Sequence, residues 1–267
     1  MSTFLGIGRS SHGSRKRSAG AKLKLFVRSA LVLGAMSLGS LLLFAVATLT
    51  LFQFRGLYLR LSTYIGRATL AIWGVRLEVT GSLPFPKTQT VFVSNHTSSI
   101  DMFVLIALGM PGARFFLSGF LRKVIPVGII GYVTGIFWTV PQDQPERRRQ
   151  IFARAASILK RTGESVYLSP EGRRITTGEL GHFNKGAFHL ATDIKAPIVP
   201  FYIDVPPSVD PGLGIDINPG TVTVEVLPTI DTSEWTLERL DEQRQYVFDR
   251  LEEVHKRRRS GVEAPPA

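Results

Sequence analysis

A run of 26 residues, from Ser29 to Phe54, contains no charged side chain and is rich in Leu, Ala, Val and Phe. As an α-helix at about 1.5 Å per residue, this run would be about 39 Å long. The hydrocarbon core of a bilayer is about 30 Å thick, so a helix of this length can cross it with a tilt. The run therefore predicts a helix embedded in a membrane.

A cleaved signal peptide is the competing interpretation of the same run, and the small residues Ala45, Val46 and Ala47 would suit its cleavage site. Two features favour a retained segment. The basic leader before the run has 28 residues. The apolar region is also far longer than the roughly 7 to 15 residues of a signal peptide. We therefore expect the helix to remain in the mature protein.

Cations on both sides of the run leave its topology open. Arg55, Arg60, Arg67 and Arg76 follow it, so both flanks are positive and the cation bias of cytoplasmic loops gives no single orientation. Residues 57–75 combine apolar side chains with spaced arginines, as an interfacial amphipathic helix does. The hypothesis that we favour is a helical hairpin held in one leaflet with both ends cytoplasmic, and the alternative is a single spanning helix.

The net charge of +11 belongs to the two ends of the chain. Residues 1–28 contain seven Lys or Arg and no acid, and residues 256–259 add four cations. The body between them, with 21 Lys or Arg and 20 acids, is close to neutral. Such tails suit an anionic membrane or nucleic acid. The adjoining apolar run favours the membrane, and basic runs without interleaved aromatics argue against a nucleic-acid partner. The absence of cysteine excludes disulfides, thiolate metal sites and cysteine nucleophiles.

Alternating strand and helix patterns beyond the apolar run predict an α/β fold, with a mostly parallel mixed sheet flanked by helices. We expect four parts: a basic cytoplasmic tail (1–28), a membrane-embedded helical segment (29–75), a globular domain (76–255) and a basic C-terminal tail (256–267). The expected strands of the domain are 76–80, 90–94, 114–117, 136–140, 165–168, 196–203 and 221–227.

A histidine and a carboxylate follow the strand expected at 90–94. His96 comes just after this strand, and Asp101 opens the helix expected at 102–108. The carboxyl ends of strands are where open α/β sheets bind ligands. On one continuous helix the two side chains would point roughly 140° apart, so they can meet only across a turn. A capping box of Ser98 and Asp101 is the alternative, but it leaves His96 unexplained.

A second polar loop, residues 169–174, follows the short buried strand expected at 165–168. In a parallel sheet its Glu171 and Arg174 would reach the same edge as His96. Arg173 and Arg174 suit an anionic ligand, because the planar guanidinium group matches phosphate oxygens. Pro-Glu-Gly-Arg is by itself an ordinary turn with solvated charges. The predicted convergence of the two loops is what favours a functional site.

Taken in order, these stretches resemble the motifs of the glycerolipid acyltransferase family, the group that includes 1-acylglycerol-3-phosphate acyltransferases. Asn95 to Asp101 is similar to its first motif, a histidine and an aspartate separated by four residues. Residues 169–174 are similar to the third motif, Pro-Glu-Gly-Thr-Arg, and residues 196–200 to the fourth. Stretches on both sides of the third motif are similar too, and the resemblance covers residues 75–227.

The resemblance implies a membrane-associated O-acyltransferase of phospholipid biosynthesis. It would move a fatty acyl group from acyl-CoA or acyl-carrier protein to the hydroxyl of a lysolipid. The reaction it favours converts 1-acyl-glycerol-3-phosphate to phosphatidic acid. The acyl thioester would be a co-substrate, and no other cofactor and no metal is expected. The expected partners are membrane lipid, the lysolipid acceptor and the acyl donor, with the catalytic domain on the cytoplasmic face.

In such a reaction His96 would be the general base, because imidazole has an unperturbed pKa suited to proton transfer near neutral pH. Asp101 would fix the tautomer of the ring and stabilise the imidazolium. Backbone N–H groups at the start of the following helix would hold the developing oxyanion. The attacking group would be the acceptor hydroxyl itself.

Substrate binding is expected from the second loop, where Glu171 would either orient the arginines or bind the acceptor hydroxyl. The arginines would bind an anionic head group or a CoA phosphate. The full set of expected substrate-binding residues is Glu171, Gly172, Arg173 and Arg174, with support from Asn95, Ser98 and Lys185.

Three departures from the family pattern leave the acceptor open. Residues 140–142 read Val-Pro-Gln where the second motif usually ends in an arginine, and residues 147–149, three arginines, follow within a polar connector expected at 142–149. Arg173 stands where threonine is common, and Ile175 where serine is common. A lyso-aminolipid or another lysophospholipid is therefore the alternative acceptor. From a different class, the alternative is a non-enzymatic, membrane-anchored basic binding protein.

Overall fold

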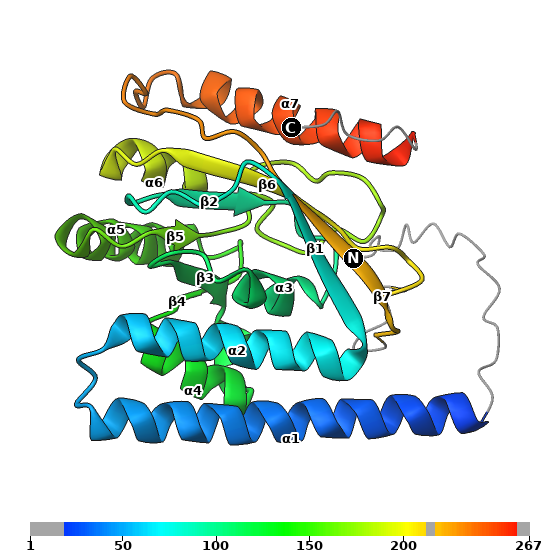
Figure 1. The fold of residues 1–267 in the computed structure, drawn as a ribbon. Helices are drawn as coiled ribbons and strands as arrows, with labels where there is room; N and C mark the ends of the chain where they lie inside the picture. The colour runs from blue at the N-terminus through cyan, green and yellow to red at the C-terminus, as the bar shows by residue number, and fades with distance from the viewer. Residues whose placement is uncertain (1–18, 212–216, 261–267) are drawn as a thin grey trace, which may run out of the picture.

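The computed structural model describes residues 19–211 and 217–260, so the first 18 residues of the expected basic leader lie outside it. Figure 1 shows two long helices on one side of the chain, α1 (Ala19–Leu49) and α2 (Arg55–Trp73), followed by alternating strands and helices. Helix α1 begins inside the range 1–28, before the expected start of the membrane segment at residue 29. The cations at its beginning are therefore helical.

Within the described residues, seven strands form one sheet in the order β1-β7-β6-β2-β5-β3-β4. Neighbouring strands run parallel except β6 and β7, which are antiparallel. This arrangement confirms the expected mostly parallel, mixed sheet. The strands are β1 (Val75–Gly81), β2 (Val91–Ser94), β3 (Arg114–Ser118), β4 (Phe137–Thr139), β5 (Val166–Tyr167), β6 (Ile198–Asp204) and β7 (Gly220–Val226).

Strand β2 lies in the interior of the sheet, between β5 and β6, and each of its residues is fully buried. Its side chains alternate between two cores, with Val91 and Val93 on one face and Phe92 on the other. Burial on both faces is typical of parallel strands covered by helices, and it explains the unbroken apolar run Val-Phe-Val. The loop after β2 is thereby fixed at the carboxyl edge.

Helices cover both faces of the sheet (Figure 1). Helices α5 (Pro145–Thr162), α6 (Gly186–Ile194) and α7 (Leu240–Arg259) pack on the face that contains Val91, while α2 and α3 (Asp101–Leu108) pack on the other. Helix α4 (Ile125–Thr134) follows a 3-10 turn, η1 (Gly119–Lys123), and packs against α1 and α2.

Helix α1 lies lengthwise along α2, antiparallel to it, on the outside of the domain (Figure 1). A stripe of small and apolar side chains at helical spacing faces the protein, whereas most of the remaining large apolar side chains are exposed. By length and composition, Leu23–Leu49 qualifies as a membrane-crossing helix. The buried stripe is Val32, Met36, Ser40, Leu43 and Ala47, and the exposed residues include Leu31, Leu33, Leu38, Leu41, Leu42 and Phe44.

An ion cluster attaches the α1–α2 hairpin to the domain. Arg55, the first residue of α2, and Arg114 of β3 both donate to the carboxylate of Glu164, which follows α5; the Arg114 Nε to Glu164 Oε2 distance is 2.6 Å. The same guanidinium groups donate to the backbone oxygens of Thr134 and Gly135 at the end of α4. One carboxylate therefore links elements that are far apart in the chain.

The cations at 256–259, expected as part of a tail, form the last turn of α7. Arg257 and Arg258 pair with Glu225 of β7, and Arg259 bonds to Glu179 and to the backbone oxygen of Gly178. The folded domain therefore extends beyond the expected boundary at 255, because these arginines bind the sheet and the segment after β5.

Candidate active site

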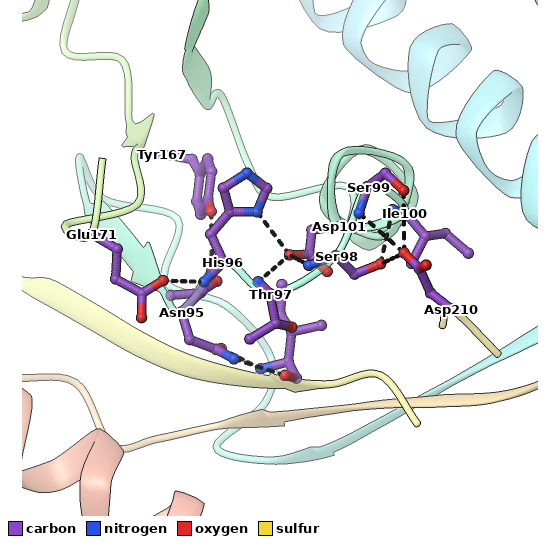
Figure 2. A network of polar contacts seen from close by, with 12 residues as sticks. Asn95, His96, Thr97, Ser98, Ser99, Ile100, Asp101, Tyr167, Glu171 and Asp210 are labelled. Carbon is purple, nitrogen blue, oxygen red and sulfur yellow. Dashed lines mark hydrogen bonds and ion pairs between the residues drawn. The ribbon is translucent and has the colours of Figure 1, made fainter. Parts of the chain in front are cut away.

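The loop after β2 brings His96 and Asp101 together across a turn (Figure 2). His96 Nδ1 lies 2.8 Å from Asp101 Oδ2. The carboxylate is 0% exposed, whereas the imidazole side chain is 35% exposed. A hydrogen bond from Nδ1–H to the carboxylate leaves Nε2 as the basic nitrogen. The pair thus has the arrangement of a general base held by a buried carboxylate.

Asp101 also fixes the loop that carries His96. Its Oδ2 accepts from the backbone N–H groups of Thr97 and Ser98, each at 2.9 Å. Ser98 Oγ accepts in turn from Ile100 N–H at 3.1 Å. The N-cap of α3 is Ile100 and no side chain caps it, so these bonds hold the preceding turn and do not form the expected capping box. Asp101 therefore holds the turn before α3 and binds the imidazole with the same oxygen.

The backbone N–H groups of residues 97–100, in the loop before α3, are already occupied. The N–H groups of Thr97 and Ser98 donate to Asp101, that of Ser99 donates to Asp210 at 3.2 Å, and that of Ile100 donates to Ser98. An oxyanion role for the first N–H groups of α3 itself stays a prediction, whereas the backbone donors of residues 97–100 hold the loop itself. They are not free to bind a developing oxyanion.

Glu171, in the loop after β5, contacts the backbone of His96. Its Oε2 accepts from His96 N–H at 2.6 Å and its Oε1 from Gly181 N–H at 2.8 Å, and the residue is 2% exposed. Burial raises the pKa of this carboxyl, although the hydrogen bonds from Gly181 and His96 lower it in part. Both oxygens are thus committed to backbone amides, which differs from the expected contact with the arginines or a substrate hydroxyl.

Asn95 extends the pairing of β2 with β6 beyond the end of the strand. Its side-chain amide donates to the backbone oxygen of Ile203 at 2.9 Å and accepts from Ile203 N–H at 2.8 Å (Figure 2). These two bonds reproduce the pattern of a β-ladder with a side chain. They fix the position at which the chain leaves the sheet, so the place of His96 follows from the residue before it.

His96 lines a cavity of about 530 Å³ at the carboxyl edge, a volume in the range of small-molecule sites. One part of its lining is apolar and includes Met102, Leu105, Phe116, Phe120 and Leu121; the other is cationic and includes Arg148, Arg173 and Arg174. The cavity therefore places His96 between an apolar surface and a cationic surface.

Comparisons with known proteins agree with this geometry. A family model described as Acyltransferase matches residues 76–204, which contain β1 to β6 and both polar loops. The crystal structure of the 1-acyl-sn-glycerophosphate (LPA) acyltransferase, PlsC, from Thermotoga maritima has the same fold, with a TM-score of 0.60 and 20% identity over 83% of this chain and 96% of that chain. Residues 76–204 therefore form a domain of the acyltransferase family.

Curated members of the family are similar to this chain over much of its length. A 1-acyl-sn-glycerol-3-phosphate acyltransferase from Saccharomyces cerevisiae is 29% identical over 72% of this chain and 68% of its own length. One from Limnanthes alba is 27% identical over 69% and 65%. The beta form from Homo sapiens is 32% identical over 60% and 58%. The chain thus spans 65% of the Limnanthes relative and 58% of the human one.

Arg148 is a cavity residue that sequence reasoning did not single out. It lies in the first turns of α5, which includes residues 145–149 of the expected connector because Pro145 and Glu146 suit a helix start. Arg148 lines the cavity with His96 and donates to the backbone oxygen of Val140 at 3.1 Å. Arg147 bonds instead to Gln144. The helical spacing of this segment was the signal that could have separated the two arginines.

Asp210 is a second residue that sequence reasoning missed. It lies in the long segment between β6 and β7, and its Oδ2 accepts from the hydroxyls of Ser98 and Ser99, at 3.1 Å for Ser99 (Figure 2). The contact binds this segment to the start of α3. A lone aspartate within a Pro- and Gly-rich loop carries no local signal for such a contact.

Lys185, expected as a supporting residue, lies away from His96. Its Nζ forms an ion pair of 2.7 Å with Asp241 at the start of α7. Lys185 also lines a neighbouring groove between α5 and α6, which shares Arg148 and Phe152 with the His96 cavity. Gly172 does line the His96 cavity, with φ +66, close to the amide nitrogens of Gln142 and Asn184. A side chain at this position would be strained by its backbone conformation and would meet Gln142.

Proposed function

We propose that this chain transfers an acyl group from a thioester to the hydroxyl of a lysolipid, with 1-acyl-glycerol-3-phosphate as acceptor and phosphatidic acid as product. The observation that carries the proposal is the His96–Asp101 pair, which opens onto a cavity with one apolar and one cationic wall. The names of the curated relatives support the same reaction class and the same acceptor.

The chemistry follows from the position of His96. Its Nε2 takes the proton of the acceptor hydroxyl as the oxygen attacks the thioester carbon. The tetrahedral intermediate then collapses, the carbon–sulfur bond breaks, and the departing thiolate takes the proton from the imidazolium. Asp101, fully buried and 2.8 Å from Nδ1, stabilises the imidazolium between these two steps. No covalent acyl-enzyme is required.

The two walls of the cavity suit the two substrates. The acyl chain is apolar and would lie against the wall that contains Met102 and Phe116, while the acceptor phosphate would lie against Arg148, Arg173 and Arg174. The donor is acyl-CoA or acyl-carrier protein, and the thioester is the only co-substrate that the reaction needs.

The membrane placement that we propose is a hairpin of α1 and α2 in one leaflet, with the catalytic domain on the cytoplasmic face. Helix α1 packs along α2 and α4 rather than projecting away from the domain. Its exposed side is rich in leucine, which suits contact with lipid acyl chains. This arrangement favours the hairpin over a helix that crosses the membrane alone.

Another lysolipid remains the second candidate acceptor, because the segment Val140 to Gln142 lacks the arginine common in the second motif. The test uses the purified full-length chain in detergent with a long-chain acyl-CoA or acyl-carrier protein as donor. Acceptors are 1-acyl-glycerol-3-phosphate, other lysophospholipids and a lyso-aminolipid. We expect transfer to 1-acyl-glycerol-3-phosphate, and a loss of about a thousandfold or more in His96→Ala.

Preferred transfer to another acceptor would correct the substrate and leave the reaction class in place. Full activity of His96→Ala would contradict the proposed general base. If the native chain transferred no acyl group to any acceptor but bound anionic vesicles, the proposal of a non-enzymatic membrane-binding protein would replace it.

A further inference from the structure

An exposed apolar surface lies on η1 and α4, far along the chain from the N-terminal hairpin. Phe120 is 69% exposed, Ile125 73% and Tyr132 69%. Ile125 and Tyr132 are seven residues apart, so they lie on one side of α4, whereas Val127, Ile130 and Val133 on the other side are buried against the protein. Helix α4 is thus apolar on its outer side as well as on its packed side.

This surface is continuous with the exposed side of α1. Ile130 and Val133 of α4 share an apolar cluster with Leu43 and Ala47 of α1. At the end of the hairpin, the Phe52 ring lies 5.8 Å from the ring of Tyr132 and 6.3 Å from that of Phe44. Figure 1 shows α4 beside α1. Any lipid or protein that covers the outer side of α1 would therefore also contact Tyr132.

Two cations border this apolar surface. Arg122 and Lys123 form the last turn of η1, both are exposed, and neither pairs with an acid within the described part of the chain. Cations beside an inserted apolar surface suit the anionic head groups of a lipid leaflet. A protein partner would need a complementary patch that is both acidic and apolar. An anionic leaflet has acidic head groups and apolar chains, and it can contact α1 and α4 at the same time.

We propose that η1 and α4 form a second membrane-contacting element, which lies in the same anionic leaflet as α1. Phe120 and Leu121 belong to η1 and also line the cavity that contains His96. Insertion of η1 therefore places the mouth of this cavity at the lipid surface, where an acceptor lipid resides. The inference rests on the membrane placement of α1 in the proposed function, and it adds a contact that the N-terminal hairpin does not supply.

The first experiment measures depth in the bilayer. The chain has no native cysteine, so a fluorophore can be attached to single cysteines introduced as Ile125→Cys on α4, Leu41→Cys on α1 and Leu237→Cys just before α7. The full-length protein is reconstituted in vesicles of phosphatidylcholine and phosphatidylglycerol with brominated acyl chains. We expect quenching at positions 125 and 41 and none at 237, because α7 lies across the sheet from α1 (Figure 1).

Quenching at position 41 without quenching at 125 would overturn this inference and leave the hairpin placement intact. Absence of quenching at both positions would overturn the membrane placement and this inference together. Vesicles of phosphatidylcholine alone should quench position 125 less. Equal quenching in the two lipid mixtures would show that Arg122 and Lys123 do not select anionic lipid.

The second experiment measures activity. Ile125→Asp should lower the rate on a long-chain acceptor presented in vesicles by about tenfold or more. The native chain buries an isoleucine in lipid at this position, whereas the variant would have to bury a charge and should contact the membrane less well. Its rate on a short-chain, water-soluble acceptor should stay within about twofold of the native rate. The matched control, Leu237→Asp, should change neither rate. Equal rates of Ile125→Asp and the native chain on vesicles would contradict the inference.

Discussion

Asp101 contacts the imidazole of His96 and the backbone of its own loop through one oxygen. The local sequence predicted both contacts, because the two residues are joined by a short turn that ends in a helix start. The role of Glu171 was not predictable in the same way. Its carboxylate reaches His96 N–H only because β5 lies beside β2 in the sheet, and no pattern within residues 169–174 encodes that neighbour.

Replacement of Asp101 by Asn tests its role at the scale of one residue. The amide cannot stabilise an imidazolium and favours the wrong ring tautomer, so we expect kcat to fall by about a hundredfold or more. The measurement is steady-state acyl transfer, with circular dichroism to verify the fold. Replacement of Asp193, an exposed aspartate of α6 that pairs with Lys160, by Asn is the matched control and should leave kcat unchanged.

A second residue-scale prediction concerns Glu171 and pH. Because burial raises its pKa above the ordinary 4.5, the folded chain binds this proton more tightly than the unfolded chain does. Its contribution to the free energy of unfolding therefore falls as pH rises from about 4.5 through the raised folded pKa. The glutamine of Glu171→Gln cannot titrate, so the free energy of unfolding of this variant should fall less over this pH range than that of the native chain.

Urea unfolding at a series of pH values checks this prediction for Glu171. The exposed carboxyl of Glu234 provides the control substitution, Glu234→Gln, which should reproduce the native pH profile. A Glu171→Gln profile parallel to the native one would show that the carboxyl does not titrate differently on folding.

At the scale of elements, the joint between the hairpin and the domain depends on Glu164. The sequence predicted the helices of the hairpin from their apolar residues, but not the partner of Arg55. Glu164 follows α5 and meets Arg55 and Arg114 only in the folded chain. Burial alone would raise the pKa of Glu164, but the hydrogen bond from Arg114 and the charge of Arg55 outweigh it and lower the pKa.

Glu164→Gln should loosen this joint at neutral pH. Because two partly buried guanidinium groups lose their counter-ion, we expect the free energy of unfolding to fall by about 3 kcal/mol. Because the folded pKa lies below the ordinary 4.5, the native contribution is complete above 4.5 and is lost as pH falls through the folded pKa. The difference in free energy of unfolding between the variant and the native chain should therefore become smaller at acidic pH.

Thermal or urea unfolding in detergent at neutral and acidic pH measures this difference for Glu164. The matched control is Glu146→Gln, which removes an exposed pair with Arg149 and should change the unfolding free energy by no more than about 1 kcal/mol. Equal effects of the two substitutions would contradict the structural role of Glu164.

At the scale of the whole molecule, the proposed hairpin places both chain ends on one side of the membrane. In sealed vesicles with the catalytic domain outside, added protease should remove a tag on the N-terminus together with the domain. Protection of the N-terminal tag while the domain is digested would instead show a spanning α1. Detergent-permeabilised vesicles, in which all sites are accessible, provide the control.

The sequence by itself determined the features that depend on neighbours along the chain. These are the long apolar helix, the alternation of strands and helices that gives a mostly parallel sheet flanked by helices, and the turn that joins His96 to Asp101. Each is a short-range pattern of hydrophobic spacing or of hydrogen bonds across a few residues. The order of the motifs also predicted the family correctly.

Only the tertiary structure decided which distant groups meet at this site. It placed Glu171 on the backbone of His96, Asp210 on the start of α3 and Arg148 in the cavity, and it left Lys185 outside. It also packed α4 against α1 and brought the ring of Tyr132 to 5.8 Å from that of Phe52. These contacts depend on strand order and helix packing, which bring together segments whose local sequences contain no record of one another.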